Sequence, residues 1–190
     1  AIHARTFIGT HHIFQRTALG IGTDQKQALD AAAAAGQEGH LLFQAAVALA
    51  GHFDAVLAVD GSTSQLARAE PHEGVHYAAA LAEQLPIRGR SVSLVAAAQA
   101  AHWFDFDRFH AECRRVLSPG GVLAVWTYEK FRVDAEVDAV VDRFYTEVVG
   151  RYWPPERRYV AQGYRTLPFP WREDPAPEFE IETDWDLETV

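Results

Sequence analysis

Two apolar stretches of the sequence end in side chains that could bind a ligand or take up a proton. The run at residues 53–60 (FDAVLAVD) finishes on Asp60, whose carboxylate can accept hydrogen bonds from two donors at once. The run at residues 91–100 (SVSLVAAAQA) is followed by His102, and an imidazole of ordinary pKa is a suitable general base near neutral pH. Asp60 is therefore a candidate binding residue and His102 a candidate base, although simple packing beside Trp103 explains the histidine equally well.

Strand-like and helix-like stretches alternate around these residues, from Gly39 to Tyr128. The predicted strands are residues 53–60, 75–82, 91–100 and 121–129, and the predicted helices are residues 44–50, 62–69 and 104–117. Such alternation predicts a Rossmann-like α/β fold, in which a mostly parallel sheet carries helices on both faces. Ligands bind such sheets at the carboxyl ends of the strands. We therefore expect one rim to carry Asp60, Glu83, residues 99–104 and residues 127–129.

The chain is expected to form a single domain, residues 1–190, with three parts. Residues 1–44 are an atypical lead-in, residues 45–129 are the core, and residues 130–177 are a helical insertion or lid after the fifth strand. Apolar residues at helical spacing between Val133 and Val148 predict an amphipathic helix in the insertion, and the proline- and aromatic-rich stretch after it is typical of a lid. The alternation near the end of the sequence predicts a sheet that is truncated at its C-terminal end.

Composition restricts the classes of protein that the chain can represent. It has 190 residues, of which 48% are hydrophobic and 23% charged, as in an ordinary globular domain. A net charge of −9 disfavours a protein that works on nucleic-acid phosphates, and no apolar run is long enough to span a membrane. The single cysteine, Cys113, argues against a structural zinc site and fits a reducing cytoplasm. We expect a cytoplasmic protein with a small-molecule substrate and no metal; the oligomeric state stays open.

Four segments occur in the order and spacing of a class I S-adenosylmethionine-dependent methyltransferase, which the chain resembles. They are AVLAVDGS at residues 55–62, AALAEQLP at 79–86, SVSLVAAAQAAHWFD at 91–105 and RVLSPGGVLAV at 115–125. The longer runs at residues 101–121 and 131–160 are similar to the small-molecule branch of trans-aconitate methyltransferase-like proteins. The resemblance implies the cofactor S-adenosyl-L-methionine and methyl transfer to a small molecule that could bear a carboxylate.

Matching the segments to this family assigns roles to individual residues. The resemblance implies cofactor contacts from Asp60 at the ribose, from Ala82 and Glu83 at the adenine, and from Gly61, Gln99, Gly36 and Gly39. It implies a catalytic His102 and a substrate pocket walled by Trp103, Phe104 and Tyr128. Plain core packing accounts about equally well for Trp103 and Phe104. The cations Arg151, Arg157 and Arg158 could pair with a carboxylate substrate, although a solvated surface accounts for them better.

Two alternatives stay open on the sequence alone. The family carries a glycine-rich loop about twenty residues before the Asp60 position, where small residues let the backbone approach the cofactor. Here that loop is reduced to Gly36 and Gly39, followed by bulky residues, which favours a catalytically inactive binding or interaction module of the same fold. The second alternative is a nucleotide-dependent oxidoreductase, which Gly20 and Gly22 together with Asp60 would suit.

Overall fold

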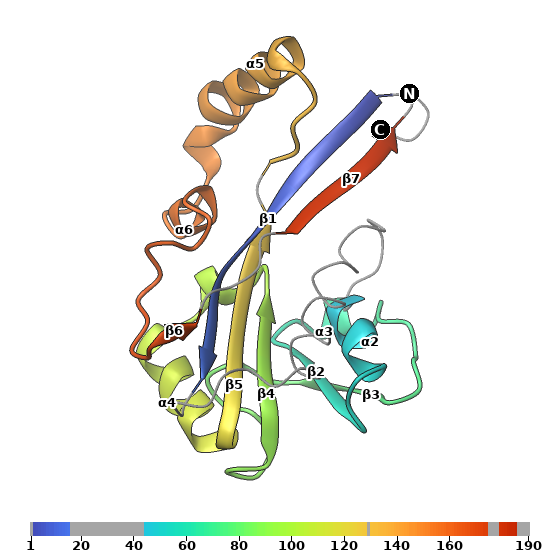
Figure 1. Cartoon of the computed structure of the whole chain (residues 1–190), viewed down its shortest axis with the longest axis vertical. Helices are drawn as coiled ribbons and strands as arrows, with labels where there is room; N and C mark the ends of the chain where they lie inside the picture. The colour runs from blue at the N-terminus through green and yellow to red at the C-terminus, as the bar shows by residue number, and fades with distance from the viewer. Residues whose placement is uncertain (1, 16–43, 129, 175–178, 186–190) are drawn as a thin grey trace.

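The computed structural model describes residues 2–15, 44–128, 130–174 and 179–185 (Figure 1). The predicted glycine loop, with Gly36 and Gly39, lies outside the described residues, as do Gly20 and Gly22. Between residues 44 and 128, helices and strands alternate along the chain and include two parallel strand pairs. This arrangement fits the Rossmann-like α/β fold that the sequence predicts.

A mixed five-stranded sheet forms the centre of the fold, with the order β4-β5-β1-β6 and with β7 paired to β1. Its strands are β1 (Ile2–Gln15), β4 (Val92–Ala98), β5 (Leu117–Tyr128), β6 (Glu173–Asp174) and β7 (Phe179–Trp185). β4 and β5 run parallel, with Val95 opposite Leu123, whereas β1 runs antiparallel to β5, β6 and β7. Figure 1 shows β1 and β7 continuing together beyond the ends of β4 and β5.

A second, two-stranded parallel sheet consists of β2 (Val56–Asp60) and β3 (Val75–Ala79), in which Asp60 lies opposite Ala79. Helices α2 (Gln44–Ala50) and α3 (Thr63–Leu66) contact this pair. The sequence predicted the four strands β2, β3, β4 and β5 but placed them in one mostly parallel sheet. The larger sheet is mixed instead, because antiparallel β1 covers the second edge of the buried strand β5. Parallel pairing is thereby restricted to β2–β3 and β4–β5 among the described strands.

Helix α4 (Phe106–Val116) starts at a side-chain cap and runs directly into a strand. The Asp105 carboxylate caps it by accepting a backbone N–H of the first turn at 3.2 Å. The sequence predicted a turn at residues 118–121 after this helix, but β5 already begins at Leu117. Residues 118–121 nevertheless have no partner in the register with β4, which passes from Leu117 directly to Val122, and Gly120 has the positive φ (81°) expected of a turn. Gly121 is tightly packed there: a Cβ would lie 3.0 Å from the Leu117 side chain.

Successive residues of β5 divide the hydrophobic core into two clusters. Leu123 and Val125 point to one side, where they join the buried residues Phe109, Cys113, Val160, Tyr164 and Leu167. The residues Val122, Ala124 and Trp126 point to the other side, where α2 contributes Leu49. This division follows from the two-residue period of a strand. It confirms that helices cover both faces of the β4–β5 pair.

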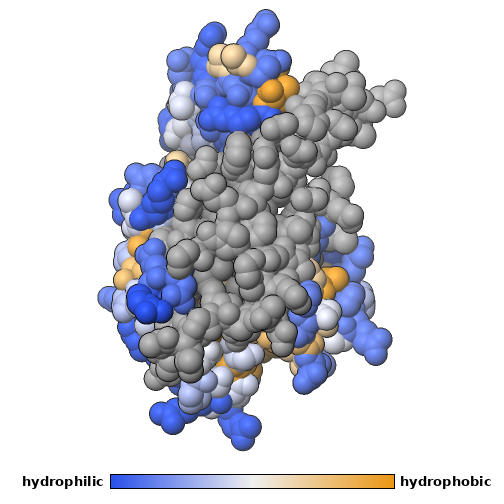
Figure 2. Space-filling model, viewed as in Figure 1, coloured by the Kyte–Doolittle hydropathy of each residue, from blue (hydrophilic) through white to orange (hydrophobic). Residues whose placement is uncertain are grey.

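A series of helical turns follows β5 in the predicted insertion. They are α5 (Ala135–Arg143), the π-helix η3 (Phe144–Val148), the 3-10 turn η4 (Gly150–Tyr152) and α6 (Arg157–Ala161). The predicted amphipathic helix is present, but no residue of α5 is buried and Val140 is 62% exposed. Figures 1 and 2 show α5 at one end of the molecule, where hydrophilic side chains surround a few apolar ones. A role of these helices as a lid stays a prediction.

The described residues were also searched for membrane-spanning helices and for clusters of metal ligands. None of the helices within them is both long and apolar enough to cross a membrane. In the same ranges, no three His, Cys, Asp or Glu side chains lie close enough together to hold a metal ion.

Candidate active site

Asp60 ends β2 with its carboxylate directed at the turn that follows. Its Oδ1 accepts the Ser62 N–H at 2.7 Å, and the Ser62 hydroxyl in turn accepts the Gln65 N–H at 3.4 Å to cap α3. A carboxylate has about four lone-pair directions. The single backbone bond to Oδ1 therefore leaves Asp60 able to accept further hydrogen bonds from a ligand.

The loop after β3 lies against the end of β2. A Cβ added at Gly61 would lie 3.3 Å from the Leu81 Cδ2 atom, and the Ala80 N–H donates to the Asp60 carbonyl at 3.1 Å. Leu81 is 56% exposed, so an accessible apolar side chain stands beside Gly61, the residue after Asp60. Sequence reasoning missed Leu81. The only signal was its place directly before Ala82, one of the predicted adenine contacts.

Ala82 and Glu83, the predicted adenine contacts, both make contacts that stabilise the fold. Ala82 packs against the core cluster that includes Phe109. Glu83 Oε1 accepts the Asp105 N–H at 2.9 Å and so ties the loop after β3 to the start of α4. Adenine contact by these two residues stays a prediction, and Glu83 has the additional task of joining two loops of the rim.

Gln99 joins the ends of β4 and β5. Its backbone is left-handed, with a φ of 52°, and its N–H donates to the Trp126 carbonyl at 2.9 Å. Its Oε1 atom accepts the Tyr128 N–H at 3.0 Å and the hydroxyl proton of the buried Thr127. The Gln99 side chain therefore holds this part of the rim together, and its predicted contact with the cofactor is untested.

His102 lies on the 3-10 turn η2 (Ala101–Trp103) and is only 4% exposed. Its Nδ1 atom is 2.7 Å from the hydroxyl of Tyr164, a fully buried residue with a left-handed backbone (φ 62°). Burial, and to a smaller extent the positive charge of Arg157, lowers the pKa of His102 to about 4. The imidazole is therefore neutral at physiological pH. Its catalytic role stays a prediction.

The three predicted substrate-facing aromatic residues are of two kinds. Trp103 is 60% exposed and Tyr128 is 48% exposed, so both present accessible rings at the rim. Phe104 instead packs against the core, with its ring centroid 4.8 Å from that of Phe109. Trp103 and Tyr128 are thus accessible, whereas Phe104 packs against the core, and contact of any of the three with substrate stays a prediction.

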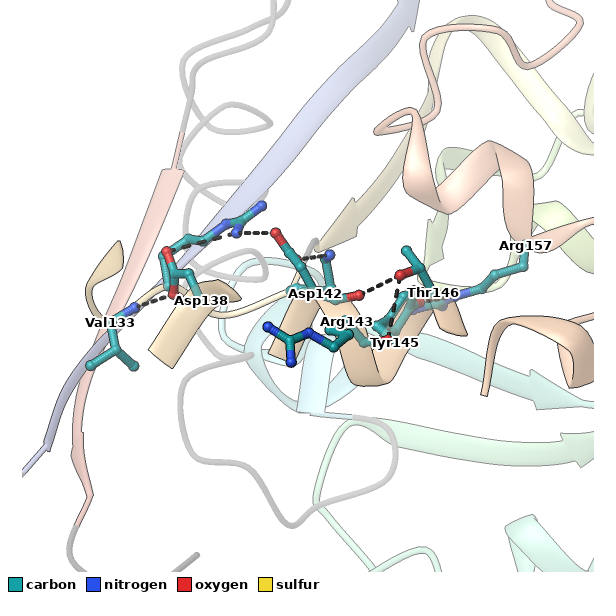
Figure 3. A network of polar contacts seen from close by, with 9 residues as sticks. Val133, Asp138, Asp142, Arg143, Tyr145, Thr146 and Arg157 are labelled. Carbon is teal, nitrogen blue, oxygen red and sulfur yellow. Dashed lines mark hydrogen bonds and ion pairs between the residues drawn. The ribbon is translucent and has the colours of Figure 1, made fainter. Parts of the chain in front are cut away.

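Arg157 is held by two aromatic side chains of the insertion, and Figure 3 shows it beside the first of them, Tyr145. Its Nε donates to the Tyr145 hydroxyl at 2.6 Å, and its guanidinium lies over the Trp153 ring, 4.9 Å from the centroid. Its charge is close enough to His102 to lower the pKa of that imidazole. No carboxylate in the described part of the chain pairs with Arg157. Sequence reasoning missed Tyr145 and Trp153, for which the aromatic-rich composition of the insertion was the only signal.

A polar network fixes the segment between β5 and α5 (Figure 3). Asp142 on α5 pairs with Lys130 and, at 3.2 Å, with Arg132, and these bonds lower the pKa of its carboxyl. Lys130 also lies 4.9 Å from the centroid of the Tyr145 ring. The network therefore positions the tyrosine that in turn holds Arg157.

The structure gathers most of the predicted site residues that it describes into two groups, one at each parallel strand pair. Asp60 and Gly61 meet the loop after β3, whereas Gln99, His102 and Tyr128 gather at the ends of β4 and β5. The bond from the Asp105 N–H to Glu83 connects the two groups. Gly36 and Gly39 are outside the described residues, so their predicted contact with the cofactor is untested.

Comparison with known proteins identifies the family of the chain. The family model for the methyltransferase domain matches residues 20–125, which is more than half of the chain. A protein of Dictyostelium discoideum assigned as a methyltransferase is 37% identical over 124 residues, covering 64% of this chain and 47% of that protein. A solved structure from Anaeromyxobacter dehalogenans, assigned as a type II methyltransferase, is 51% identical with a TM-score of 0.64. The alignment with it covers 75% of this chain and 59% of the other.

The fold fits a Rossmann-like domain of the α/β class. The chain belongs to the methyltransferase domain family. It spans about half the length of the curated relative that it matches. Membership of this family implies S-adenosylmethionine as the methyl donor, whereas the trans-aconitate-like branch, the substrate and the residue roles go beyond what the comparisons show.

Proposed function

We propose that this chain catalyses methyl transfer from S-adenosylmethionine to a small carboxylate-bearing molecule, as in the trans-aconitate-like branch. The observation that carries the substrate class is the placement of Arg157. Its guanidinium is held by Tyr145 and Trp153, lies near His102, and has no described carboxylate partner. A fixed guanidinium of this kind matches the planar, two-oxygen geometry of a carboxylate.

The residues at the end of β2 fit the nucleoside part of the cofactor. Asp60 keeps free lone pairs for ribose hydroxyls. Gly61 has no side chain, which lets the neighbouring loop with Leu81 approach closely, and the exposed Leu81 offers an apolar surface to a base. Bound S-adenosylmethionine supplies an electrophilic methyl group on its sulfonium. The protein then has to align the acceptor and exclude water. The exposed rings of Trp103 and Tyr128 can do both by packing against the bound acceptor.

The remaining sequence-based expectations are part of the same proposal. We take residues 1–190 to act as one domain, and a cytoplasmic location remains expected. Nothing in the comparisons favours a catalytically inactive module, and the family assignment favours methyl transfer over the oxidoreductase alternative.

Calorimetric titration with S-adenosylhomocysteine tests the cofactor site. We expect micromolar binding by the wild-type chain and a loss of roughly 10- to 100-fold in Asp60→Ala, because a charged acceptor of ribose hydroxyls contributes about 1.5–3 kcal/mol. Asp54→Ala is the matched control, since Asp54 is an exposed carboxylate that precedes β2. Absence of heat at millimolar ligand in the wild-type chain would refute the proposal.

Methylation assays with a panel of small di- and tricarboxylates, each paired with its neutral amide, test the substrate class. Arg157→Gln should raise KM for the carboxylates by roughly 10- to 100-fold and leave the amides unaffected. Arg143→Gln, an exposed cation on α5, is the control. If the amides are the better substrates of the wild-type chain, the carboxylate assignment is wrong.

A further inference from the structure

The guanidinium of Arg157 is fixed along one side, and its far end has no protein partner in the described part of the chain. A guanidinium carries five N–H donors, one on Nε and two on each terminal nitrogen. The Nε donor is bound to the Tyr145 hydroxyl at 2.6 Å, whereas Nη1 and Nη2 make no hydrogen bond to a described residue. The terminal donors therefore remain for water or for a ligand.

Two aromatic rings hold the plane of this guanidinium. Its central carbon lies 4.9 Å from the centroid of the Trp153 ring and 5.5 Å from that of the Tyr145 ring. The two rings also contact each other, with their centroids 5.1 Å apart. Water can bind the terminal donors when no anion is present, so their exposure alone indicates no ligand. What distinguishes Arg157 is that its side chain is already ordered, which reduces the conformational entropy that a bound anion has to overcome.

Tyr145 is itself positioned by an unusual backbone turn. It lies in the π-helix η3, a form that is rare and often occurs at functional sites. The Val149 N–H donates to the Phe144 carbonyl at 3.1 Å, which is the five-residue spacing of a π turn. Within the same turn the Thr146 hydroxyl donates to the Asp142 carbonyl at 2.7 Å (Figure 3). The phenol is therefore presented to the guanidinium by a π turn rather than by a regular α-helix.

The fixed guanidinium also lies near the ends of β4 and β5. Burial is the main cause of the lowered pKa of His102, and the charge of Arg157 lowers it further. A charge has such an effect only on a neighbouring group. An anion bound to the free end of Arg157 would therefore lie near the candidate base.

We propose that Tyr145 is a positioning residue that determines how Arg157 binds a carboxylate. Because the Tyr145 hydroxyl occupies the Nε donor, the side of the fork that combines Nε with a terminal nitrogen is closed to a second ligand. A carboxylate has to bind end-on, with one oxygen on Nη1 and the other on Nη2, a bidentate pairing that a lysine cannot make. This role rests on the carboxylate substrate proposed above, whereas the bond between Tyr145 and Arg157 does not.

Tyr145→Phe tests the role because it removes only the hydroxyl and keeps the ring that contacts Trp153. The Arg157 side chain would then rotate more freely, so KM for the carboxylates should rise roughly 3- to 10-fold with kcat unchanged, and the neutral amides should be unaffected. Tyr152→Phe is the matched control, because this tyrosine is 71% exposed and its ring lies beside Arg151 instead. An unchanged KM in Tyr145→Phe, or an equal rise for the amides, would overturn the proposal.

Arg157→Lys keeps the positive charge but loses the fork, and it keeps the test valid if Tyr145→Phe does not fold. KM for the carboxylates should rise roughly tenfold or more, because an ammonium group cannot make the end-on pair. A lysine variant with the KM of the wild-type chain would show that Arg157 acts through its charge alone, and the proposal would then be wrong.

Nitrogen NMR of the 15N-labelled full chain separates this inference from the proposed function. The Nε–H signal of Arg157, assigned by its loss in Arg157→Lys, should exchange slowly with water. Tyr145→Phe should accelerate the exchange, and Tyr152→Phe should not. Fast exchange in the wild-type chain would refute the role of Tyr145 even if carboxylates are methylated. Slow exchange in a wild-type chain that methylates no carboxylate would support the bond while refuting the substrate proposed for it.

Discussion

Acidification from pH 7 to pH 4 is expected to destabilise the fold through His102. Burial, with a smaller contribution from Arg157, lowers the pKa of this imidazole from 6.5 to about 4 in the folded chain. In the unfolded chain the pKa returns to its ordinary value. Between these two values the unfolded state binds a proton that the folded state does not bind, so the free energy of unfolding falls as the pH falls through this window.

The size of the effect follows from the two pKa values. At 1.36 kcal/mol per pH unit, the difference between 6.5 and about 4 corresponds to about 3 kcal/mol between pH 7 and pH 4. His102 is 4% exposed, so solvent screens it little. Domains of this size are stable by roughly 5–15 kcal/mol, which makes the loss a large fraction of the total. His110, whose pKa burial also lowers, adds a change of the same sign.

Urea unfolding at a series of pH values between 7 and 4 measures this change. The His102→Gln variant can still hydrogen-bond Tyr164 but does not titrate, so the wild-type chain should lose about 3 kcal/mol more than this variant over the range. His76→Gln is the control for the same substitution at an exposed histidine, because His76 lies exposed on β3. Equal pH dependence in the wild-type chain and His102→Gln would refute the reasoning.

Three further outcomes are expected. The Cys113 thiol is fully buried and burial raises its pKa to about 12, so a thiol reagent should modify it only after unfolding; rapid reaction of the native chain would contradict its placement. Glu112→Ala should lower the free energy of unfolding by about 1–3 kcal/mol, because the carboxylate accepts the Leu85 N–H at 2.6 Å and also binds Arg115. Thermal melts measure this change, and an unchanged melting temperature would argue against a stabilising role of these bonds. Asp134→Ala removes the cap that accepts two N–H groups at 2.9 Å and should cost α5 about 1 kcal/mol, seen as faster amide exchange confined to that helix.

The parallel strands could be predicted from local pattern, whereas their partners could not. The apolar runs that became β2, β3 and β4 are bounded by Gly, Asp and Pro residues, and each strand lies within the predicted run. The pairing of β1 with β5 joins residues more than a hundred positions apart, such as Ile8 and Tyr128. Strand runs do not encode their neighbours, so one mixed sheet and one separate pair could not be distinguished from a single parallel sheet.

In the site, too, residues marked by the local sequence pattern could be predicted, whereas contacts between distant parts of the chain could not. Asp60 and His102 were placed at strand ends because each follows an apolar run, and the structure puts them there. Tyr164 was not found, because its contact with His102 spans 62 positions and depends on how the insertion folds back. Val140 was predicted on the apolar face of a helix, yet it is exposed, since helical periodicity does not specify what the face packs against.

Gln99 and Tyr164 keep a left-handed backbone, although a non-glycine residue in that region costs on the order of 1 kcal/mol. Glycine would remove this strain, but at position 164 it would also leave a cavity in the core, because Tyr164 is fully buried. Loss of a buried aromatic side chain costs about 3–5 kcal/mol, which exceeds the strain. At position 99, glycine would leave the buried Thr127 hydroxyl without its acceptor. Selection of variants for melting temperature should therefore retain both strained residues, so the positive φ angles mark side chains that the fold cannot lose.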